Sequence, residues 1–226
     1  MKAKMTLLEA IQARHSVRTY KAEKIGEEVL AALEAELEEN NRRAGLSMQL
    51  RTEEPEAFQG LMARMGGFEN VNSYIALVAK EGPEWEEKLG YRGQKLVLLA
   101  QQLGLNSCWV AATYNKGKSG ATVGPGEKLH LAIALGYGQN QGRLHKNKDL
   151  SALYVAEVKP PEWFLLGMRA AQLAPTAMNR QSFRFALLEG NRVAAEPGKG
   201  GNGRIDLGIA KLHFEIGAGE GDWRWA

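Results

Sequence analysis

A compact apolar run at residues 72–80, Asn-Ser-Tyr-Ile-Ala-Leu-Val-Ala-Lys, constrains the fold more than any other part of the sequence. A short run without regular polar alternation is typical of a strand that is buried on both faces. A helical pattern of apolar residues follows over about 85–103, Gly104 gives a helix-ending signal, and the chain then enters a second extended apolar stretch. The order strand, helix, strand predicts a chain of mixed α and β structure.

The rest of the chain carries further helix and strand patterns. Thr6 and Glu9 have the spacing of a capping box, in which each side chain satisfies a free backbone N–H at the start of a helix. Residues 45–70 carry no clear pattern, so only a loop or a short helix is expected there. The glycine-rich segment 197–203 is expected to form a flexible hairpin or lid. Helices are predicted at about 7–14, 26–40, 163–173 and 206–217, and strands at 130–135 and 183–188, with 192–195 as the hairpin partner of the last strand.

Composition and charge exclude several classes of protein. The 226 residues, with 44% hydrophobic side chains, suit one globular domain. A net charge of +3, from 29 basic and 26 acidic residues, gives no support for a nucleic-acid partner. Cys108 is the single cysteine, which excludes an internal disulfide and favours a reducing compartment. Residues 1–9 lack the apolar core of a signal peptide and no apolar run approaches the ~20 residues of a membrane span, so a cytoplasmic location without membrane contact is expected.

Three familiar site motifs fail on spacing. Residues 117–119, Gly-Lys-Ser, resemble the end of a phosphate-binding loop, but that motif requires a glycine where the chain has Ala112. The glycines at 136, 138 and 142 follow a strand, yet three residues separate the second from the third, where the dinucleotide fingerprint has two. The histidines show no metal-binding spacing, so no metal site is expected.

Two segments carry the polar groups of a candidate ligand site. Residues 14–20, Arg-His-Ser-Val-Arg-Thr-Tyr, follow a short predicted helix, and their two guanidiniums, hydroxyl and loop amides suit a phosphate or a ring carbonyl. An exposed basic turn is the alternative. Within 174–185, Asn179 and Gln181 each carry a donor and an acceptor, as required to bind a heteroaromatic edge with alternating N–H and C=O groups.

Four segments together resemble the nitroreductase family of FMN-dependent oxidoreductases. Residues 14–20 resemble the family's opening Arg-Arg/His-Ser-x-Arg-x-Phe/Tyr motif, and residues 174–181, Ala-Pro-Thr-Ala-Met-Asn-Arg-Gln, are similar to its Ala-Pro-Ser-x-x-Asn-x-Gln motif. Residues 103–110, Leu-Gly-Leu-Asn-Ser-Cys-Trp-Val, are similar to its Leu-Gly-Leu-Gly-Ser/Thr-Cys-Trp-Ile segment. Arg143, Lys146 and Lys148 fit the basic cluster that in this family closes on the FMN phosphate.

The order of these motifs departs from the ordinary family pattern. In ordinary members the Pro-Ser-x-x-Asn motif follows the arginine motif after one helix, whereas here it begins at Ala174, far from Arg14. This reordered layout resembles most closely a divergent branch of the family, over the whole chain. The resemblance implies an α+β fold, as three α/β/α layers with a mainly antiparallel central sheet and permuted motif order, in a single domain over residues 1–226. It also suggests two pseudo-related halves that meet near residues 150–162.

The resemblance further implies a cofactor, a cosubstrate and a partner. It implies a homodimer with FMN at the interface, and hydride transfer from NAD(P)H through flavin N5 to a nitroaromatic, a quinone or a similar small acceptor. No side chain is assigned a catalytic role. Whether Pro175 to Asn179 contact the flavin of their own or of a partner chain is left open, as is the division of tasks between Arg14 and Arg18. The implied cofactor-binding residues are Arg14, His15, Ser16, Arg18, Trp109, Val110, Ala111, Arg143, Lys146, Lys148, Pro175, Thr176, Ala177, Asn179 and Gln181.

Two other classes of function stay open at this stage. One is a flavin-binding or flavin-modifying protein without NAD(P)H turnover, because the motifs specify FMN and not its electron donor. The other is a non-enzymatic module that binds anions through residues 143–148, although no aromatic residues are interleaved there. Near the motifs, Trp109 is expected to pack in the core, Cys108 to act as a small apolar filler, and His145 to be solvated.

Overall fold

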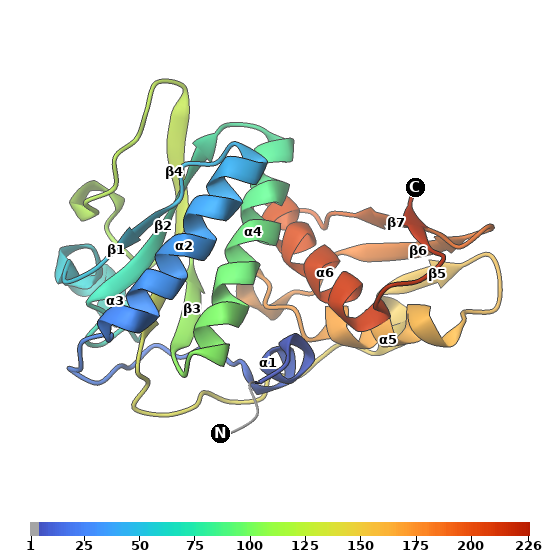
Figure 1. The fold of residues 1–226 in the computed structure, drawn as a ribbon, viewed down its shortest axis with the longest axis horizontal. Helices are drawn as coiled ribbons and strands as arrows, with labels where there is room; N and C mark the ends of the chain where they lie inside the picture. Colours follow the sequence, from blue (N-terminus) through green and yellow to red (C-terminus); the bar gives the residue numbers. More distant parts are fainter. Residues whose placement is uncertain (1–4) are drawn as a thin grey trace.

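The structure is a computed structural model that describes residues 5–226. Residues 1–4, part of the segment expected to lack signal-peptide character, lie outside the described residues. The strands form two four-stranded sheets, here called the large sheet and the small sheet (Figure 1). The large sheet has the order β1-β2-β4-β3 and is antiparallel throughout, with β1 (Gln49–Arg51), β2 (Ser73–Lys80), β3 (Asn106–Val110) and β4 (Glu127–Gly136).

The small sheet is built from the last part of the chain. Its central strands form an antiparallel hairpin, and each outer strand pairs with its neighbour in parallel. The order is β5 (Tyr154–Ala156), β6 (Arg184–Leu188), β7 (Arg192–Glu196) and β8 (Arg224–Trp225).

The helices join the two sheets into one body. Helices α2 and α4 lie across one face of the large sheet, and α6 lies between α4 and the small sheet, with α5 beside it (Figure 1). The α-helices are α1 (Leu7–Ala13), α2 (Glu27–Ala44), α3 (Leu61–Met65), α4 (Pro83–Gln102), α5 (Glu162–Gln172) and α6 (Gly203–Ala218), and the 3₁₀ turns are η1 (Pro55–Phe58), η2 (Lys116–Lys118), η3 (Leu150–Ala152) and η4 (Ala177–Asn179).

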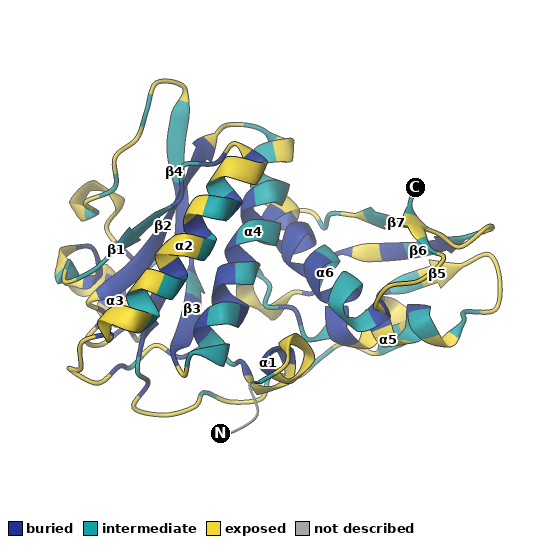
Figure 2. Cartoon of the chain, in the orientation of Figure 1, coloured by how far each residue is buried: buried dark blue, intermediate teal, exposed yellow. Residues whose placement is uncertain are grey.

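Strand β2 is buried on both faces, as its apolar run predicts. Ile75 and Leu77 pack into the apolar cluster that contains the inward side of α4, while Tyr74 and Ala76 pack into a second cluster on the other face. Alternate side chains of a strand point to opposite faces, so each face has to be covered by other parts of the chain. Figure 2 shows the buried residues concentrated in β2, in β4 and on the inner sides of α4 and α6.

Two glycines allow α4 and α6 to cross in backbone contact. A Cβ atom built on Gly208 of α6 would lie 2.0 Å from the carbonyl oxygen of Glu87, and one built on Gly90 of α4 would lie 2.1 Å from the carbonyl oxygen of Ile205. No side chain fits such gaps, so both positions require glycine. The close crossing fixes the position of α6, and with it the small sheet, relative to the large sheet.

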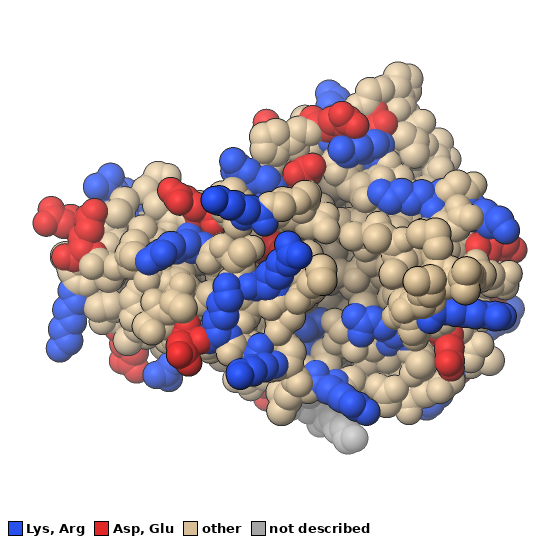
Figure 3. Space-filling view, turned by 180° about the vertical axis from the view of Figure 1, so that it is seen from behind, with Lys and Arg blue, Asp and Glu red and all other residues tan. Residues whose placement is uncertain are grey.

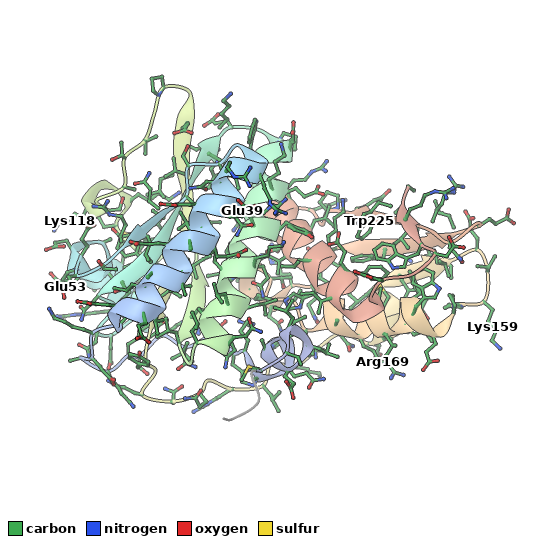
Figure 4. The ribbon with its side chains drawn as sticks, in the orientation of Figure 1. Glu39, Glu53, Lys118, Lys159, Arg169 and Trp225 are labelled. Carbon is green, nitrogen blue, oxygen red and sulfur yellow. The ribbon has the colours of Figure 1, made fainter. Side chains whose placement is uncertain are left out.

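Aromatic side chains form the core between α6 and the small sheet. The Phe214 ring on α6 stacks on that of Phe185 on β6, with ring centroids 5.1 Å apart, and meets the Trp223 ring edge to face. Trp225, labelled in Figure 4, reaches from β8 to α6, where its indole N–H donates to Glu215 Oε1 at 2.9 Å. The last residues of the chain therefore anchor the small sheet on α6.

The α+β class and the antiparallel sheet are confirmed, and the strands divide between two sheets instead of forming one central sheet. The capping box is present, because Glu9 N–H donates to Thr6 Oγ1 at 3.2 Å and Thr6 N–H donates to Glu9 Oε2 at 2.7 Å. The hairpin of β6 and β7 lies where it was predicted. Residues 45–70 contain β1, η1 and α3 rather than only a loop or one short helix. Within residues 5–226, no helix has the length and apolar character needed to cross a membrane.

Candidate functional site

A cavity of about 830 Å³ lies between the large sheet, the start of α6 and the loops that follow α1, β4 and α5. This volume is in the range typical of small-molecule sites. Figure 3, seen from behind, shows a hollow near the middle of this face with Lys and Arg side chains around it. The walls come mainly from residues 14–19 after α1, 109–112 at the end of β3, 140–145 after β4, 175–182 after α5, and 199–209 around the start of α6.

The first wall segment is held along the edge of the large sheet. Val17 N–H donates to the carbonyl oxygen of Ser107 at 3.1 Å, and Ser16 bridges to the same residue of β3. The buried Tyr20 hydroxyl donates to the carbonyl oxygen of Val17 at 2.7 Å and closes the turn. Arg14, Ser16 and Arg18 alternate along this extended segment, which explains why all three reach the cavity wall.

Arg14 is the strongest electrostatic feature of the cavity. It is only 3% exposed, and its Nε and Nη1 atoms are buried without a hydrogen-bond partner. No carboxylate in the described part of the chain forms an ion pair with it, and burial lowers the pKa of Arg14 to about 10. A buried guanidinium without a counter-charge is costly unless a ligand pairs with it. The site is therefore suited to an anion.

Two histidines lie close to Arg14. Burial and the Arg14 charge lower the pKa of both His15 and His145. His15 Nδ1 and His145 Nε2 are buried without partners, as are the Arg14 nitrogens. His145 lines the cavity and is partly buried, so it is less exposed than the expectation of a solvated side chain implied. Its ring is half-buried because the loop after β4 folds back over residues 14–17, bringing Gly142 against His15.

The end of β3 forms the cavity wall through Trp109, Val110 and Ala111. Trp109 packs against the core as predicted, and its indole N–H donates to Gln94 Oε1 at 3.0 Å. Gln94 Nε2 lies 2.8 Å from His213 Nε2, and His213 Nδ1 lies 3.0 Å from the carbonyl oxygen of Ala170. A carbonyl oxygen only accepts, so His213 Nδ1 carries the proton and His213 Nε2 accepts from Gln94 Nε2. The donor and the acceptor of each hydrogen bond from Trp109 to Ala170 are therefore defined. This network anchors Trp109 to α4, α6 and α5.

Mild acid is expected to destabilise the protein through His213. Complete burial lowers the pKa of His213 to about 3, against about 6.5 in the unfolded chain. The unfolded state therefore takes up the proton first, and the free energy of unfolding falls by up to about 1.4 kcal/mol per pH unit below pH 6.5. Urea unfolding between pH 6.5 and 5 should show a shallower fall for His213→Gln than for the natural protein. If the free energy of unfolding fell equally steeply with pH in both proteins, the role assigned to His213 would be contradicted, because all other titrating groups are the same in the two proteins.

The loop after α5 holds a strained backbone. Met178, Asn179 and Gln181 have positive φ angles of 53°, 52° and 43°, which side-chain-bearing residues rarely adopt. Polar contacts hold it in place, since Asn179 Nδ2 donates to the carbonyl oxygen of Lys146 at 2.8 Å and Gln181 N–H donates to Thr176 Oγ1 at 3.0 Å. Strain of this kind is found where surrounding contacts fix a functional surface.

Asp206 was missed by the sequence analysis. It lies in the first turn of α6, it is 6% exposed, and it lines the cavity. Its carboxylate accepts from Ala177 N–H, and burial raises its pKa to about 6. An aspartate at the start of an apolar helix normally indicates only a helix terminus, so no sequence signal marked it as part of a site.

Most of the predicted site residues line this one cavity. Segments 14–18 and 175–179 therefore meet within a single chain, although they are far apart in sequence. Four predicted residues, His15, Lys146, Lys148 and Gln181, do not line the wall. The predicted residues at the wall are Arg14, Ser16, Arg18, Trp109, Val110, Ala111, Arg143, Pro175, Thr176, Ala177 and Asn179.

Lys148 and Gln181 brace the strained loop instead of facing the cavity. Gln181 is 1% exposed, and its Oε1 accepts from Lys148 N–H at 2.7 Å while its Nε2 donates to the carbonyl oxygen of Gln172 at 2.5 Å. Lys148 Nζ donates to the carbonyl oxygen of Gln181 at 3.0 Å. These contacts correct the expectation that the Gln181 amide meets a ligand directly, because both of its polar atoms already have backbone partners.

Fold and cavity together define an α+β protein with a cavity of small-molecule size, lined by several cationic side chains, between the large sheet and the start of α6. The family model described as "Putative TM nitroreductase" matches residues 6–218, and the chain belongs to this nitroreductase family. No curated protein matches the chain.

Solved structures share the fold. A structure described as a "putative nitroreductase" from Thermotoga maritima is 21% identical, with a TM-score of 0.69, over 96% of this chain and 85% of that one. A structure described as a "putative nitroreductase in complex with fmn" from Desulfovibrio desulfuricans is 17% identical, with a TM-score of 0.52, over 68% of this chain and 96% of that one. An FMN-dependent nitroreductase from Clostridium difficile is 16% identical, with a TM-score of 0.51, over 64% of this chain and 95% of that one.

Proposed function

We propose that this protein binds FMN in the cavity and passes hydride from NAD(P)H to a nitroaromatic, a quinone or a similar small acceptor. The observation that carries the proposal is the buried, unpaired guanidinium of Arg14 in the cavity wall. FMN offers a phosphate for that charge and a planar ring for the apolar walls. The FMN contained in the D. desulfuricans relative supports the choice of cofactor.

The residues present fit such a molecule. Arg14 and His145, which both line the cavity, carry buried nitrogen atoms without hydrogen-bond partners, and the acceptor oxygens of a phosphate would supply those partners. Charge-assisted hydrogen bonds of this type contribute about 1.5 to 3 kcal/mol each. We assign the phosphate to Arg14, Ser16, Arg143 and His145.

The remaining wall is assigned to the ring. Arg18, the end of β3 and residues 175–179 line the rest of the cavity. When bound, FMN supplies hydride transfer at its ring, and the chain's own residues bind and orient it there. A guanidinium at the ring edge stabilises the negative charge that accompanies reduction, so Arg18 is assigned this electrostatic role.

The test is direct. The purified protein is expected to be yellow and to release FMN on denaturation, or, if colourless, to gain about 2.7 kcal/mol of stability at an FMN concentration a hundredfold above Kd. Under anaerobic conditions, NADH or NADPH should then reduce the bound flavin and bleach its yellow colour. No FMN binding would overturn the proposal, and binding without bleaching by either nucleotide would indicate a flavin-binding protein that lacks NAD(P)H turnover.

Removing Arg143 is expected to weaken FMN binding selectively. Arg143→Ala should lower FMN affinity roughly tenfold to a hundredfold, since it removes one charge-assisted contact. Riboflavin, which lacks the phosphate, should bind the variant and the natural protein alike. The readout is the ratio of the two affinities, measured by fluorescence titration. Lys159→Ala, at the far end of the molecule in Figure 4, is the matched control and should leave the ratio unchanged. An equal loss for both flavins would contradict the phosphate assignment.

The proposal extends to domain organisation, assembly and location. We propose a single domain with two halves that meet near residues 150–162, because the cavity takes wall residues from both sides of that point. A homodimer in the cytoplasm is proposed on the family resemblance and the single cysteine. Light scattering tests the dimer. Because one chain provides all the cavity walls described above, the proposal places FMN in the cavity of each chain and makes no use of the interface, so FMN affinity is expected to be independent of protein concentration.

A further inference from the structure

Asp206 is a buried carboxyl group in the cavity wall that takes no part in the contacts proposed for the phosphate and the ring. Among the wall residues within 5–226, it alone has a carboxyl side chain, and the other charged wall residues are arginines and a lysine. Its position in the first turn of α6 fixes it against the strained loop, since both of its oxygens accept from Ala177 N–H, at 3.0 and 3.1 Å.

No basic side chain in the described part of the chain forms an ion pair with Asp206. The basic residues Arg204 and Lys211 of α6 pair with Glu87 of α4 instead. Burial is the largest influence on the Asp206 pKa, and the Ala177 hydrogen bond opposes it only in part. The other charged groups that share the cavity wall are Arg14, Arg18 and Arg143 on the large-sheet side and Arg180 and Lys199 on the loops next to Asp206.

Filling the cavity changes the environment of this carboxyl group. Asp206 is 6% exposed and lines the cavity, so the water that its carboxylate can meet lies on the cavity side. A ligand that occupies the cavity excludes that water, and a carboxylate without a cation then favours its neutral, protonated form. The carbonyl oxygen of a protonated carboxyl still accepts from Ala177 N–H, so protonation keeps the contact with the loop.

We propose that Asp206 takes up a proton when a flavin fills the cavity, so that flavin binding is linked to pH through this one side chain. The inference rests on the proposed function. Uptake occurs only where Asp206 is ionised before binding. Because burial raises its pKa to about 6 in the open cavity, the linkage is expected above pH 6 and is lost below it.

Riboflavin affinity as a function of pH tests the proposal. Riboflavin is the probe because FMN has a phosphate that titrates near pH 6 and would also contact His145, a second group that can titrate. Uptake of one proton makes the affinity fall by up to about tenfold per pH unit, so between pH 6.5 and 7.5 the natural protein is expected to approach that loss. Asp206→Asn keeps an acceptor for Ala177 N–H but cannot titrate, so its affinity should stay flat. Parallel profiles for the two proteins would overturn the proposal.

Calorimetry in buffers of different ionisation enthalpy measures the proton directly. At pH 7 the natural protein and the exposed control Asp222→Asn should each take up close to one proton per riboflavin, and Asp206→Asn should take up none. If Asp206→Asn does not fold, the natural protein alone decides, because uptake has to be near zero at pH 5 and rise through pH 6. Riboflavin binding without uptake overturns only this inference. No binding of riboflavin or FMN overturns the proposed function and this inference together.

Discussion

Replacing Arg14 by Met is expected to stabilise the flavin-free protein and to remove most of its FMN affinity. Met has a similar length without the charge, so it relieves the buried guanidinium that lacks a partner. The gain in the free energy of unfolding should be about 1 to 3 kcal/mol. Loss of one or two charge-assisted contacts should weaken FMN binding by roughly 10² to 10³. A substitution that raises the free energy of unfolding and lowers FMN affinity indicates that the natural residue serves ligand binding and not stability.

Two measurements separate the effects. Urea unfolding without flavin gives the change in stability, and fluorescence titration gives FMN affinity. Arg169→Met is the matched control, because Arg169 is exposed on α5, where Figure 4 labels it, and does not line the cavity. It should change neither quantity by more than about 0.5 kcal/mol. A destabilised Arg14→Met protein that still binds FMN normally would show that Arg14 serves packing and not a ligand.

Gly208→Ala is expected to cause the largest loss of stability of any single methyl group added to α6. The new Cβ would lie 2.0 Å from the carbonyl oxygen of Glu87 and 2.7 Å from the backbone nitrogen of Tyr91, so the two helices have to separate. Overpacking against backbone costs about 3 kcal/mol or more, which lowers Tm by roughly 6 to 12 °C for a chain of this size. FMN affinity should fall as well, because α6 carries the wall residues Ile205, Asp206 and Ile209.

The control for this substitution lies in the same part of the chain. Gly201 has no atom within 4 Å of an added Cβ, and its φ is not in the left-handed region. Gly201→Ala should therefore leave Tm within about 2 °C of the natural value. Gly90→Ala, on the opposite side of the crossing, should resemble Gly208→Ala. Near-normal stability of both helix variants would contradict the backbone contact between α4 and α6.

Local patterns predicted the longer elements, because their signals lie within a few residues. The apolar run of β2, the capping box of α1 and the helix end at Gly104, which has a φ of 85°, are all found in the structure. The elements between 45 and 70 were not predicted because distant contacts hold them. Strand β1 exists through its pairing with β2, and Phe58 of η1 is fixed by the rings of Tyr74 and Tyr114.

The sequence motifs predicted most residues of the candidate site, and the errors of that prediction have one cause. Lys148 and Gln181 carry side chains suited to phosphate and ring edges, yet the fold uses them to brace a loop. His145 and Asp206 lack a distinguishing local pattern, yet burial makes both of them unusual. Residue type gives the chemistry available, and only the three-dimensional surroundings decide which groups are left without partners.

The sequence by itself determined the α+β class, most helices and strands, and the resemblance to nitroreductases, because those depend on local periodicity and on the order of a few motifs. Only the tertiary structure decided that segments 14–18 and 175–179 of one chain face each other. That arrangement depends on the crossing of α4 and α6 at Gly90 and Gly208, a contact between residues far apart in the chain. It also decided that Arg14 is buried without a counter-charge, since desolvation is a property of the folded surroundings and not of the residue.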